Sequence, residues 1–383
     1  MSRLAGWKRQ TIHAPGGQSA TFVELFFDLV FVFALTEVTH FAVTHLDPGG
    51  VARTILIFWL IWWAWSQWTW ALNPADTEHG LVRIGTLAAT AIAFAMAVSV
   101  EDAFNADGAL WFVVPYILVR LFGLALYARV ATERAQHLAA VRTFAALSMF
   151  GFAVVLIGGF ADPDARVWWW LAAVVLDLLV AGRVAGFEGW HIHPEHFAER
   201  HGLFVIIALG ESLIVAAAGV AGAERTAELA AVAIGAIAVT CLLWWTYFGW
   251  LEEGLAARLR ELKDGSRSSF ARDAYSLCHL LIIAGVVAVA VGLEELVAHP
   301  AGEVGGDVLA ALGVGVALFL GASAAAWARA GNGILWARIV VPAGLGALLV
   351  LVAGLTAGWI LALVVGSLAL IVAIETLTRS RTD

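Results

Sequence analysis

The chain has 383 residues, of which 61% are hydrophobic and only 14% are charged, whereas an ordinary soluble domain is about 25% charged. This composition indicates a polytopic membrane protein. A net charge of −8 and the lack of a basic stripe argue against nucleic acid as a partner. The two cysteines, Cys241 and Cys278, lie in apolar runs and support neither a disulfide framework nor a zinc cluster. No metal or cofactor is predicted.

The apolar runs predict an all-α fold of about twelve transmembrane helices, because about 20 apolar residues suffice to cross a bilayer. No cleavable signal peptide precedes the first run, which is therefore expected to remain as a span. The connections are short, apart from residues 187–199 and 251–269. The predicted spans are residues 22–44, 51–71, 81–100, 109–130, 141–160, 166–186, 200–221, 227–250, 270–292, 305–328, 335–354 and 356–377.

The distribution of Lys and Arg predicts the orientation. Most of them, Arg200 and Arg338 included, fall in the N-terminal segment, the even-numbered loops and the C-terminus. The odd-numbered loops hold only Arg53, Arg166 and Arg225. Both termini are therefore expected on the cytoplasmic side.

The two halves of the chain resemble each other in order and spacing. The segment Ala34-Leu35-Thr36-Glu37 matches Ala208-Leu209-Gly210-Glu211. Tryptophans match at a constant spacing, and these are Trp62, Trp63, Trp244 and Trp245. Residues 1–190 and 191–383 are therefore expected to be two six-helix repeats of one membrane domain. An even number of spans gives both repeats the same orientation, so a pseudo-two-fold axis along the membrane normal is expected, with a central site or pathway between the halves.

The first span carries carboxylates that an apolar helix does not need. Thr21 and Glu24 have the form of a capping box, in which Glu24 reaches back to the helix start. Asp28 lies one turn further on the same face, and a cap cannot explain it. A carboxylate at that depth is costly unless it is paired, hydrated or protonated, so Asp28 is predicted to have a functional or buried-pair role.

Glu37 and Glu211 occupy matching places in the two halves. Pseudo-symmetry suggests that they face each other across the axis, where two close carboxylates would keep a proton between them. That arrangement suits a proton carrier or a cation site. The alternative is that each one hydrogen-bonds a neighbouring helix.

Arg120 and Asp177 lie in the middle of their predicted spans. They are expected to form a buried ion pair that locks the 109–130 span to the 166–186 span, or to pair with the first span. The alternative is that Arg120 binds an anion or lowers the pKa of a nearby carboxyl.

Aromatic and histidine residues give weaker signals. Trp62, Trp63, Trp244 and Trp245 could line a pathway, although packing between helices explains them equally simply. Several histidines lie between His191 and His201 at a spacing that matches no usual zinc pattern, so a solvated loop entering the next span is expected. His279, inside the 270–292 span, is a further candidate for a proton relay.

The segment from Val23 to Ala34 (VELFFDLVFVFA) and the segment from Glu199 to Ser212 (ERHGLFVIIALGES) resemble the low-temperature-requirement A (LtrA) family. The resemblance implies a multi-pass protein of the bacterial inner membrane that is linked by name to growth in the cold. It implies no substrate.

The segment from Phe26 to Thr36 is also similar to the first helix of six-helix potassium channels with an F-S-D motif. Those channels occur as six-plus-six duplications and line their pore with this helix. Here Phe27 replaces the serine, and Gly202 occupies the place of the aspartate in the second half. The resemblance therefore supports a pore role for Asp28 but not for the second repeat.

Together these patterns predict a transport protein, either an ion-coupled transporter of a small solute or a cation channel. Glu37 and Glu211 would be the ion or proton site, supported by Asp28, Arg120 and Asp177. The alternative is a non-transporting membrane stress or assembly factor, in which the buried charges only specify packing. No enzymatic activity is predicted, because neither H-E-x-x-H nor G-x-S-x-G occurs. The expected partners are the lipid bilayer and a small ion or solute, and homo-oligomerisation stays open.

Overall fold

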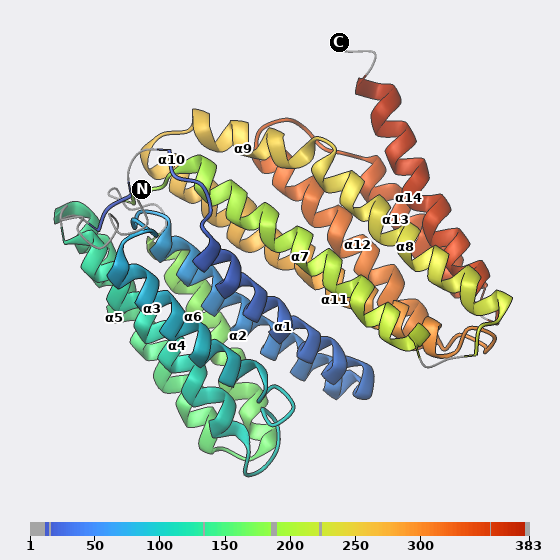
Figure 1. Ribbon diagram of the computed structural model, residues 1–383, viewed down its shortest axis with the longest axis horizontal. Coiled ribbons are helices and arrows are strands. Elements are labelled where there is room, and N and C mark those ends of the chain that lie inside the picture. The colour runs from blue at the N-terminus through green and yellow to red at the C-terminus, as the bar shows by residue number, and fades with distance from the viewer. Residues whose placement is uncertain are drawn as a thin grey trace, which may run out of the picture. The chain divides into compact units, whose positions relative to one another are not determined.

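The computed structural model describes residues 12–14, 17–132, 135–184, 190–221, 224–352 and 354–379. Over these residues the fold is all-α, as the sequence predicts, with two isolated β-bridges besides the helices (Figure 1). The helices are α1 (Phe22–Thr44), α2 (Pro48–Leu72), α3 (Gly80–Ala97), α4 (Ala109–Ala131), α5 (Ala135–Phe160), α6 (Pro163–Val184), α7 (Pro194–Ala221), α8 (Ala227–Phe248), α9 (Leu251–Glu261), α10 (Asp264–Phe270), the π-helix η2 (Ala271–Leu277), α11 (Cys278–Ala298), α12 (Gly306–Arg329), α13 (Ala337–Leu351) and α14 (Ala357–Arg379).

Within the described ranges, 8 helical segments are long and apolar enough to cross a membrane. The chain is therefore a multi-pass membrane protein. Each of the predicted spans overlaps a helix, although the count of twelve crossings stays a prediction. Several boundaries differ from the sequence prediction: α5 already begins at Ala135 and α7 at Pro194, α11 ends at Ala298, and the expected connection 251–269 contains α9 and α10.

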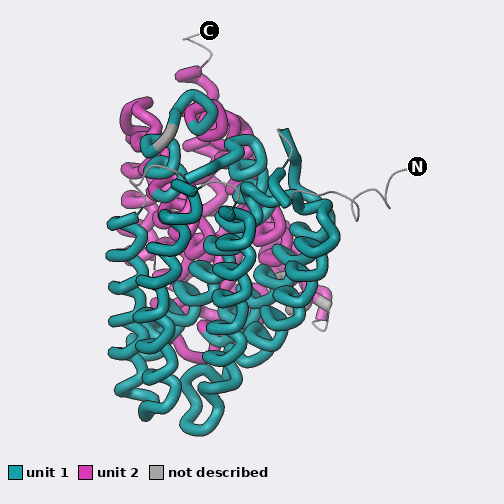
Figure 2. The backbone as a smooth tube through the Cα atoms, turned by 90° about the vertical axis from the view of Figure 1, so that its left-hand side faces the viewer, with its two compact units in different colours: residues 1–41, 47–204, 259–272 teal, residues 42–46, 205–258, 273–383 magenta. Residues whose placement is uncertain are grey.

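The chain divides into two compact units (Figure 2). Unit 1 comprises residues 1–41, 47–204 and 259–272. Unit 2 comprises residues 42–46, 205–258 and 273–383. The predicted repeats, 1–190 and 191–383, are a different division of the chain and stay a prediction.

The two units have related helix neighbours. In unit 1, α3 packs on α4, α4 on α5, α5 on α6, and α2 on both α4 and α6. In unit 2, α11 packs on α12, α12 on α13, α13 on α14, and α8 on α14 and α11. For the helices that the sequence predicts to be equivalent, the chain of contacts from α3 to α6 matches that from α11 to α14, and α2–α6 matches α8–α14. The remaining contacts differ, because α2 packs on α4 whereas α8 packs on α11.

The closest helix packing in unit 2 depends on two glycines that face each other. A Cβ atom at Gly285 of α11 would lie 2.6 Å from the backbone nitrogen of Phe319 and 2.7 Å from the carbonyl oxygen of Gly315 on α12. Small residues allow helix backbones to approach this closely inside a membrane.

We therefore expect Gly285→Ala to destabilise the protein by about 1–3 kcal/mol, because a backbone cannot move aside as a flexible side chain does. The measurement is the free energy of unfolding in mixed detergent micelles. Gly321→Ala on α12 is the matched control, since a Cβ atom there meets nothing within 4 Å. Equal stabilities of the two variants would contradict the close-packing account.

Three arginines that the sequence analysis assigns to loops are instead fully buried in helices, and these are Arg166, Arg200 and Arg338. Arg166 donates to the carbonyl oxygens of Ala103 at 2.9 Å and Gly158 at 3.1 Å, and so ties α6 to the end of α5 and to the turn after α3. The prediction that these arginines lie in loops is therefore wrong. Their burial is tolerated because each has polar partners inside the protein.

Candidate functional site

Acidic residues of α1 and basic residues of α7 form a buried cluster in unit 1, which we call the Glu24–Arg200 cluster. Its members are Glu24, Asp28, His196 and Arg200, and each is 0% exposed. On each helix the two members are one turn apart, so both point to the same side. The equal spacing lets the acidic pair of α1 face the basic pair of α7.

Arg200 joins both carboxylates of the cluster. Its Nε donates to Asp28 Oδ2 at 3.0 Å, and its Nη2 donates to Asp28 Oδ1. Its Nη1 donates to Glu24 Oε1 at 2.7 Å. The contact with Asp28 is bidentate, which is the strongest common geometry between a guanidinium and a carboxylate.

Further donors complete the shell around the two acids. Trp65 of α2 donates from Nε1 to Asp28 Oδ1 at 2.7 Å. The backbone nitrogen and the hydroxyl of Thr21 both donate to Glu24 Oε2 at 2.9 Å. The predicted capping contact between Glu24 and the start of α1 is thus confirmed. Every oxygen of the two carboxylates lies near a hydrogen-bond donor.

The two ring nitrogens of His196 have different neighbours: Nε2 lies near Glu24, and Nδ1 lies near two side-chain amides. Its Nε2 lies 2.9 Å from Glu24 Oε1. Its Nδ1 lies 3.3 Å from Asn73 Nδ2 and 3.4 Å from Gln18 Nε2.

Backbone partners fix the orientation of these two amides. Asn73 donates from Nδ2 to the carbonyl oxygen of His193 at 3.0 Å and accepts from the nitrogen of His193 at 2.7 Å. Gln18 donates from Nε2 to the carbonyl oxygen of Ala75 at 3.0 Å. Both amides therefore turn N–H groups toward His196, so its Nδ1 accepts and the proton of the neutral ring lies on Nε2.

Arg120 and Asp177 form a second buried pair in unit 1, and the structure confirms their predicted contact. Nη1 of Arg120 lies 3.2 Å from Asp177 Oδ2. The guanidinium also donates to Tyr116 Oη at 2.7 Å and to Gln67 Oε1 at 2.9 Å, and it lies 4.6 Å from the ring centroid of Phe152. The pair thus connects α4 with α2, α5 and α6, and most of its donors are already engaged.

The remaining predicted acidic residues lie in different units. Glu37 is half-buried on α1 in unit 1, where the charges of His40 and Glu101 act on it. Glu211 is half-buried on α7 in unit 2. The joint site of Glu37 and Glu211 stays a prediction.

The predicted pathway tryptophans have different surroundings. Trp62 is buried, and its ring centroid lies 4.8 Å from that of Trp65. Trp63 is also buried and stacks on Trp59. The equivalent residues of unit 2 are exposed, and these are Trp244 and Trp245. Their role as pathway lining stays a prediction.

Unit 2 contains a buried ion pair of its own. Arg338 of α13 donates from Nε to Glu375 Oε1 of α14 at 2.6 Å and from Nη2 to the carbonyl oxygen of Thr246 at 2.6 Å. Trp250 donates from Nε1 to Glu375 Oε2 at 3.0 Å. This pair connects α8, α13 and α14.

His279 of α11 follows the π-helix η2 directly and is fully buried. Its Nδ1 lies 2.9 Å from the carbonyl oxygen of Ala274, which can only accept, so Nδ1 carries the proton. The hydroxyl of Tyr247 lies 2.6 Å from Nε2 and donates to it. Both nitrogens of the neutral imidazole are therefore satisfied, and the role of His279 as a proton relay stays a prediction.

The expectation of a solvated loop between His191 and His201 is wrong for its central part. His196 lies in the first turn of α7 and is fully buried against Glu24, and His201 is buried as well. Sequence reasoning therefore missed two members of the cluster, His196 and Arg200. A usable signal was present, because their spacing equals that of Glu24 and Asp28 and their charges are complementary.

Comparison with known proteins identifies the family of the chain. The profile described as "Bacterial low temperature requirement A protein (LtrA)" matches residues 19–373. A protein of Rhizobium meliloti (strain 1021), described as uncharacterized, is 31% identical over 294 residues, which cover 73% of this chain and 70% of that protein. No solved structure matches the chain. The chain therefore belongs to the bacterial low-temperature-requirement A (LtrA) family.

Proposed function

We propose that this protein transports a proton or a small cation across the cell membrane, either as a channel or coupled to a small solute. The Glu24–Arg200 cluster is proposed as its ion or proton site. The proposal assigns the chain no enzymatic activity.

The observation that supports this function is the charge balance of the cluster. When both acids are ionised, Glu24 and Asp28 each contribute one negative charge, and Arg200, which contacts both, contributes one positive charge. His196 is neutral when Nδ1 accepts from Asn73 and Gln18, as their orientation requires. The cluster thus carries one negative charge in excess.

An excess charge in a fully buried site is expensive unless something compensates it. Buried ionisable groups within membrane spans commonly mark ion or proton pathways for this reason. A proton or a small cation that enters the cluster would neutralise the excess. Its passage would then require Arg200 to release one of the two acids.

The proposed topology has twelve spans in two six-helix repeats, with both termini in the cytoplasm. The helix contacts common to the two units, α3 to α6 with α2–α6 and α11 to α14 with α8–α14, support the repeat. The excess of Lys and Arg in the even-numbered loops and at the termini supports the orientation. Burial of Arg200 and Arg338 removes two residues from that excess, but the bias persists without them.

One observation favours the alternative, a membrane stress or assembly factor that does not transport. The Arg120–Asp177 pair lies among satisfied partners, as expected for a charge pair that only locks helices together. If the Glu24–Arg200 cluster has the same role, neutral isosteres of its acids should preserve the biological function.

The proposed function is tested by flux measurements on purified protein in liposomes, with a pH dye and a panel of monovalent cations. We expect wild-type protein to carry a proton or cation flux and Asp28→Asn to abolish it, because the neutral side chain removes the excess charge. Asp177→Asn is the matched control, since it also neutralises a buried carboxylate paired with an arginine in unit 1. It should retain flux when normalised to folded protein.

The other outcomes separate the hypotheses. Loss of flux in Glu37→Gln or Glu211→Gln, with flux retained in Asp28→Asn, would move the site to the matched glutamates. Equal loss in Asp28→Asn and Asp177→Asn would contradict a specific role for the cluster. Wild-type protein that carries no flux of any tested ion would reject transport in favour of the alternative.

A further inference from the structure

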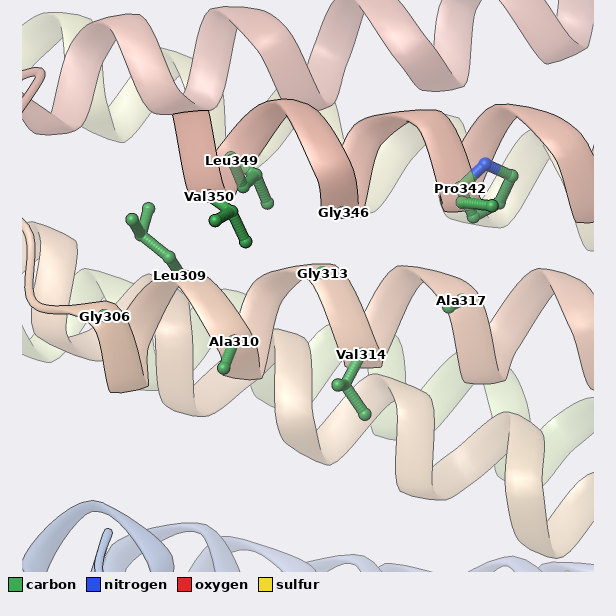
Figure 3. A pocket seen from close by; sticks show the side chains of 11 residues that line it. Gly306, Leu309, Ala310, Gly313, Val314, Ala317, Pro342, Gly346, Leu349 and Val350 are labelled. Carbon is green, nitrogen blue, oxygen red and sulfur yellow. The ribbon is translucent and has the colours of Figure 1, made fainter. Parts of the chain in front are cut away.

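Unit 2 has an apolar groove between α12 and α13, with a cavity volume of about 510 Å³ (Figure 3). One wall comes from α12 and the other from α13. Its lining includes Gly306, Ala310 and Ala317 on α12, and Pro342, Gly346 and Val350 on α13.

Small residues keep this groove open along its length. A Cβ atom added at Gly346 would meet nothing within 4 Å, and one at Gly313 would make only ordinary contacts, 3.4 Å from Leu349 Cδ1 and 3.8 Å from Gly346 Cα. Side chains of ordinary size at these positions would fill the space. The groove is therefore a property of the sequence of these two helices.

The groove covers the depth of one leaflet. It runs from Gly306, the first residue of α12, to Ala317, a distance of about 16 Å at 1.5 Å per residue. On α13 it runs from Val350, next to the last residue, back to Pro342 (Figure 3). This length is about half of the 30 Å hydrocarbon core of a bilayer.

We propose that this groove binds one acyl chain of a phospholipid whose headgroup carries an ammonium group, such as phosphatidylethanolamine. The site is separate from the Glu24–Arg200 cluster and does not depend on the proposed transport function.

The surroundings of the groove identify the occupant as a lipid chain. α12 is one of the helices long and apolar enough to cross the membrane, and Val314 and Val350 on the rim are 54% and 76% exposed. The groove is thus continuous with a surface that faces hydrocarbon. A gap that protein atoms leave unfilled there forfeits dispersion contacts, and a flexible acyl chain restores them.

Charge at the open end of the groove selects the headgroup. Glu303 and Asp307 lie beside Gly306 and are exposed. The sequence has no Lys or Arg between Arg272 and Arg329 or between Arg338 and Arg379. These carboxylates therefore repel a headgroup with net negative charge and attract an ammonium group.

The test is native mass spectrometry of the full-length protein in detergent, titrated with an equal mixture of phosphatidylethanolamine and phosphatidylglycerol of the same chain length. Wild-type protein should retain one lipid, with a preference of about two- to fivefold for phosphatidylethanolamine. Gly346→Leu should reduce retention of either lipid by at least about tenfold, because its side chain takes the place of two or more methylenes.

Gly344→Leu is the matched control, because Gly344 also has nothing within 4 Å of an added Cβ atom but does not line the groove. It should retain lipid like wild type. Ala310→Leu fills the groove from the opposite wall and gives an independent result if Gly346→Leu fails to fold. The double change Glu303→Gln and Asp307→Asn should remove the headgroup preference without removing the lipid.

Three results would overturn the proposal. Undiminished lipid in the folded groove-filling variants would show that the lipid binds elsewhere. Equal loss in Gly344→Leu would show that the effect is not specific to the groove. A dimer mass that Gly346→Leu converts to a monomer, without loss of lipid, would make the groove an interface between two copies of the chain.

Discussion

Arg200→Ala is expected to destabilise the folded protein by about 3–5 kcal/mol. The guanidinium is the one fully ionised cation that contacts both Glu24 and Asp28 within the described residues. Its removal leaves two carboxylates buried at 0% exposure without a compensating charge. Orphaned buried charges cost far more than the pair itself contributes.

The measurement is the free energy of unfolding in mixed micelles, compared among three variants. Arg200→Lys should recover only part of the loss, because an ammonium group cannot form the bidentate contact with Asp28. Arg329→Ala is the control, since it breaks a bridge of 2.8 Å to Asp273 whose side chains are 44% and 23% exposed. That loss should stay below about 1 kcal/mol. Equal losses for Arg200→Ala and Arg329→Ala would contradict the burial argument.

Arg120→Ala is expected to destabilise by about 3–5 kcal/mol through the orphaned Asp177. Here the decisive comparison is with the double variant Arg120→Met and Asp177→Leu, which removes both charges and keeps similar volume. It should cost less than Arg120→Ala alone, because no buried charge remains without a partner.

Unfolding measurements on the single and double variants give the coupling between the two positions. Arg53→Ala is a control in the same unit, because its bridge of 3.2 Å to Asp164 is solvent-exposed and should contribute below about 1 kcal/mol. A double variant less stable than Arg120→Ala would show that the charges stabilise the fold beyond their mutual compensation.

The Arg120–Asp177 pair and the Glu24–Arg200 cluster differ in their charge balance. Arg120 and Asp177 balance each other, and Tyr116 and Gln67 satisfy further donors. The Glu24–Arg200 cluster has an additional carboxylate and a neutral imidazole. Similar stability losses with different effects on flux would therefore distinguish a packing device from an ion site.

The sequence by itself determined where the long apolar helices form and that the chain spans a membrane. Long apolar runs must satisfy their backbone hydrogen bonds internally in lipid, and an α-helix does so within one segment. It also predicted the pair of Arg120 and Asp177, because mid-span charges of opposite sign have few alternatives to each other. The sequence also predicted the start of α1, because the capping contact joins Thr21 and Glu24, which lie within one turn of each other.

Only the tertiary structure decided that Arg200 and His196 are the partners of Glu24 and Asp28. The spacing of His196 and Arg200 matches that of Glu24 and Asp28. Hydropathy, however, assigned Arg200 to the edge of a span, where a long side chain can reach water, so nothing in the sequence required its burial. The partners lie on α1 and α7, far apart in the chain, and the pairing depends on which helix faces meet. The neutral form of His196 depends on Asn73 and Gln18 from yet other segments, and therefore on a contact geometry that no spacing within one helix encodes.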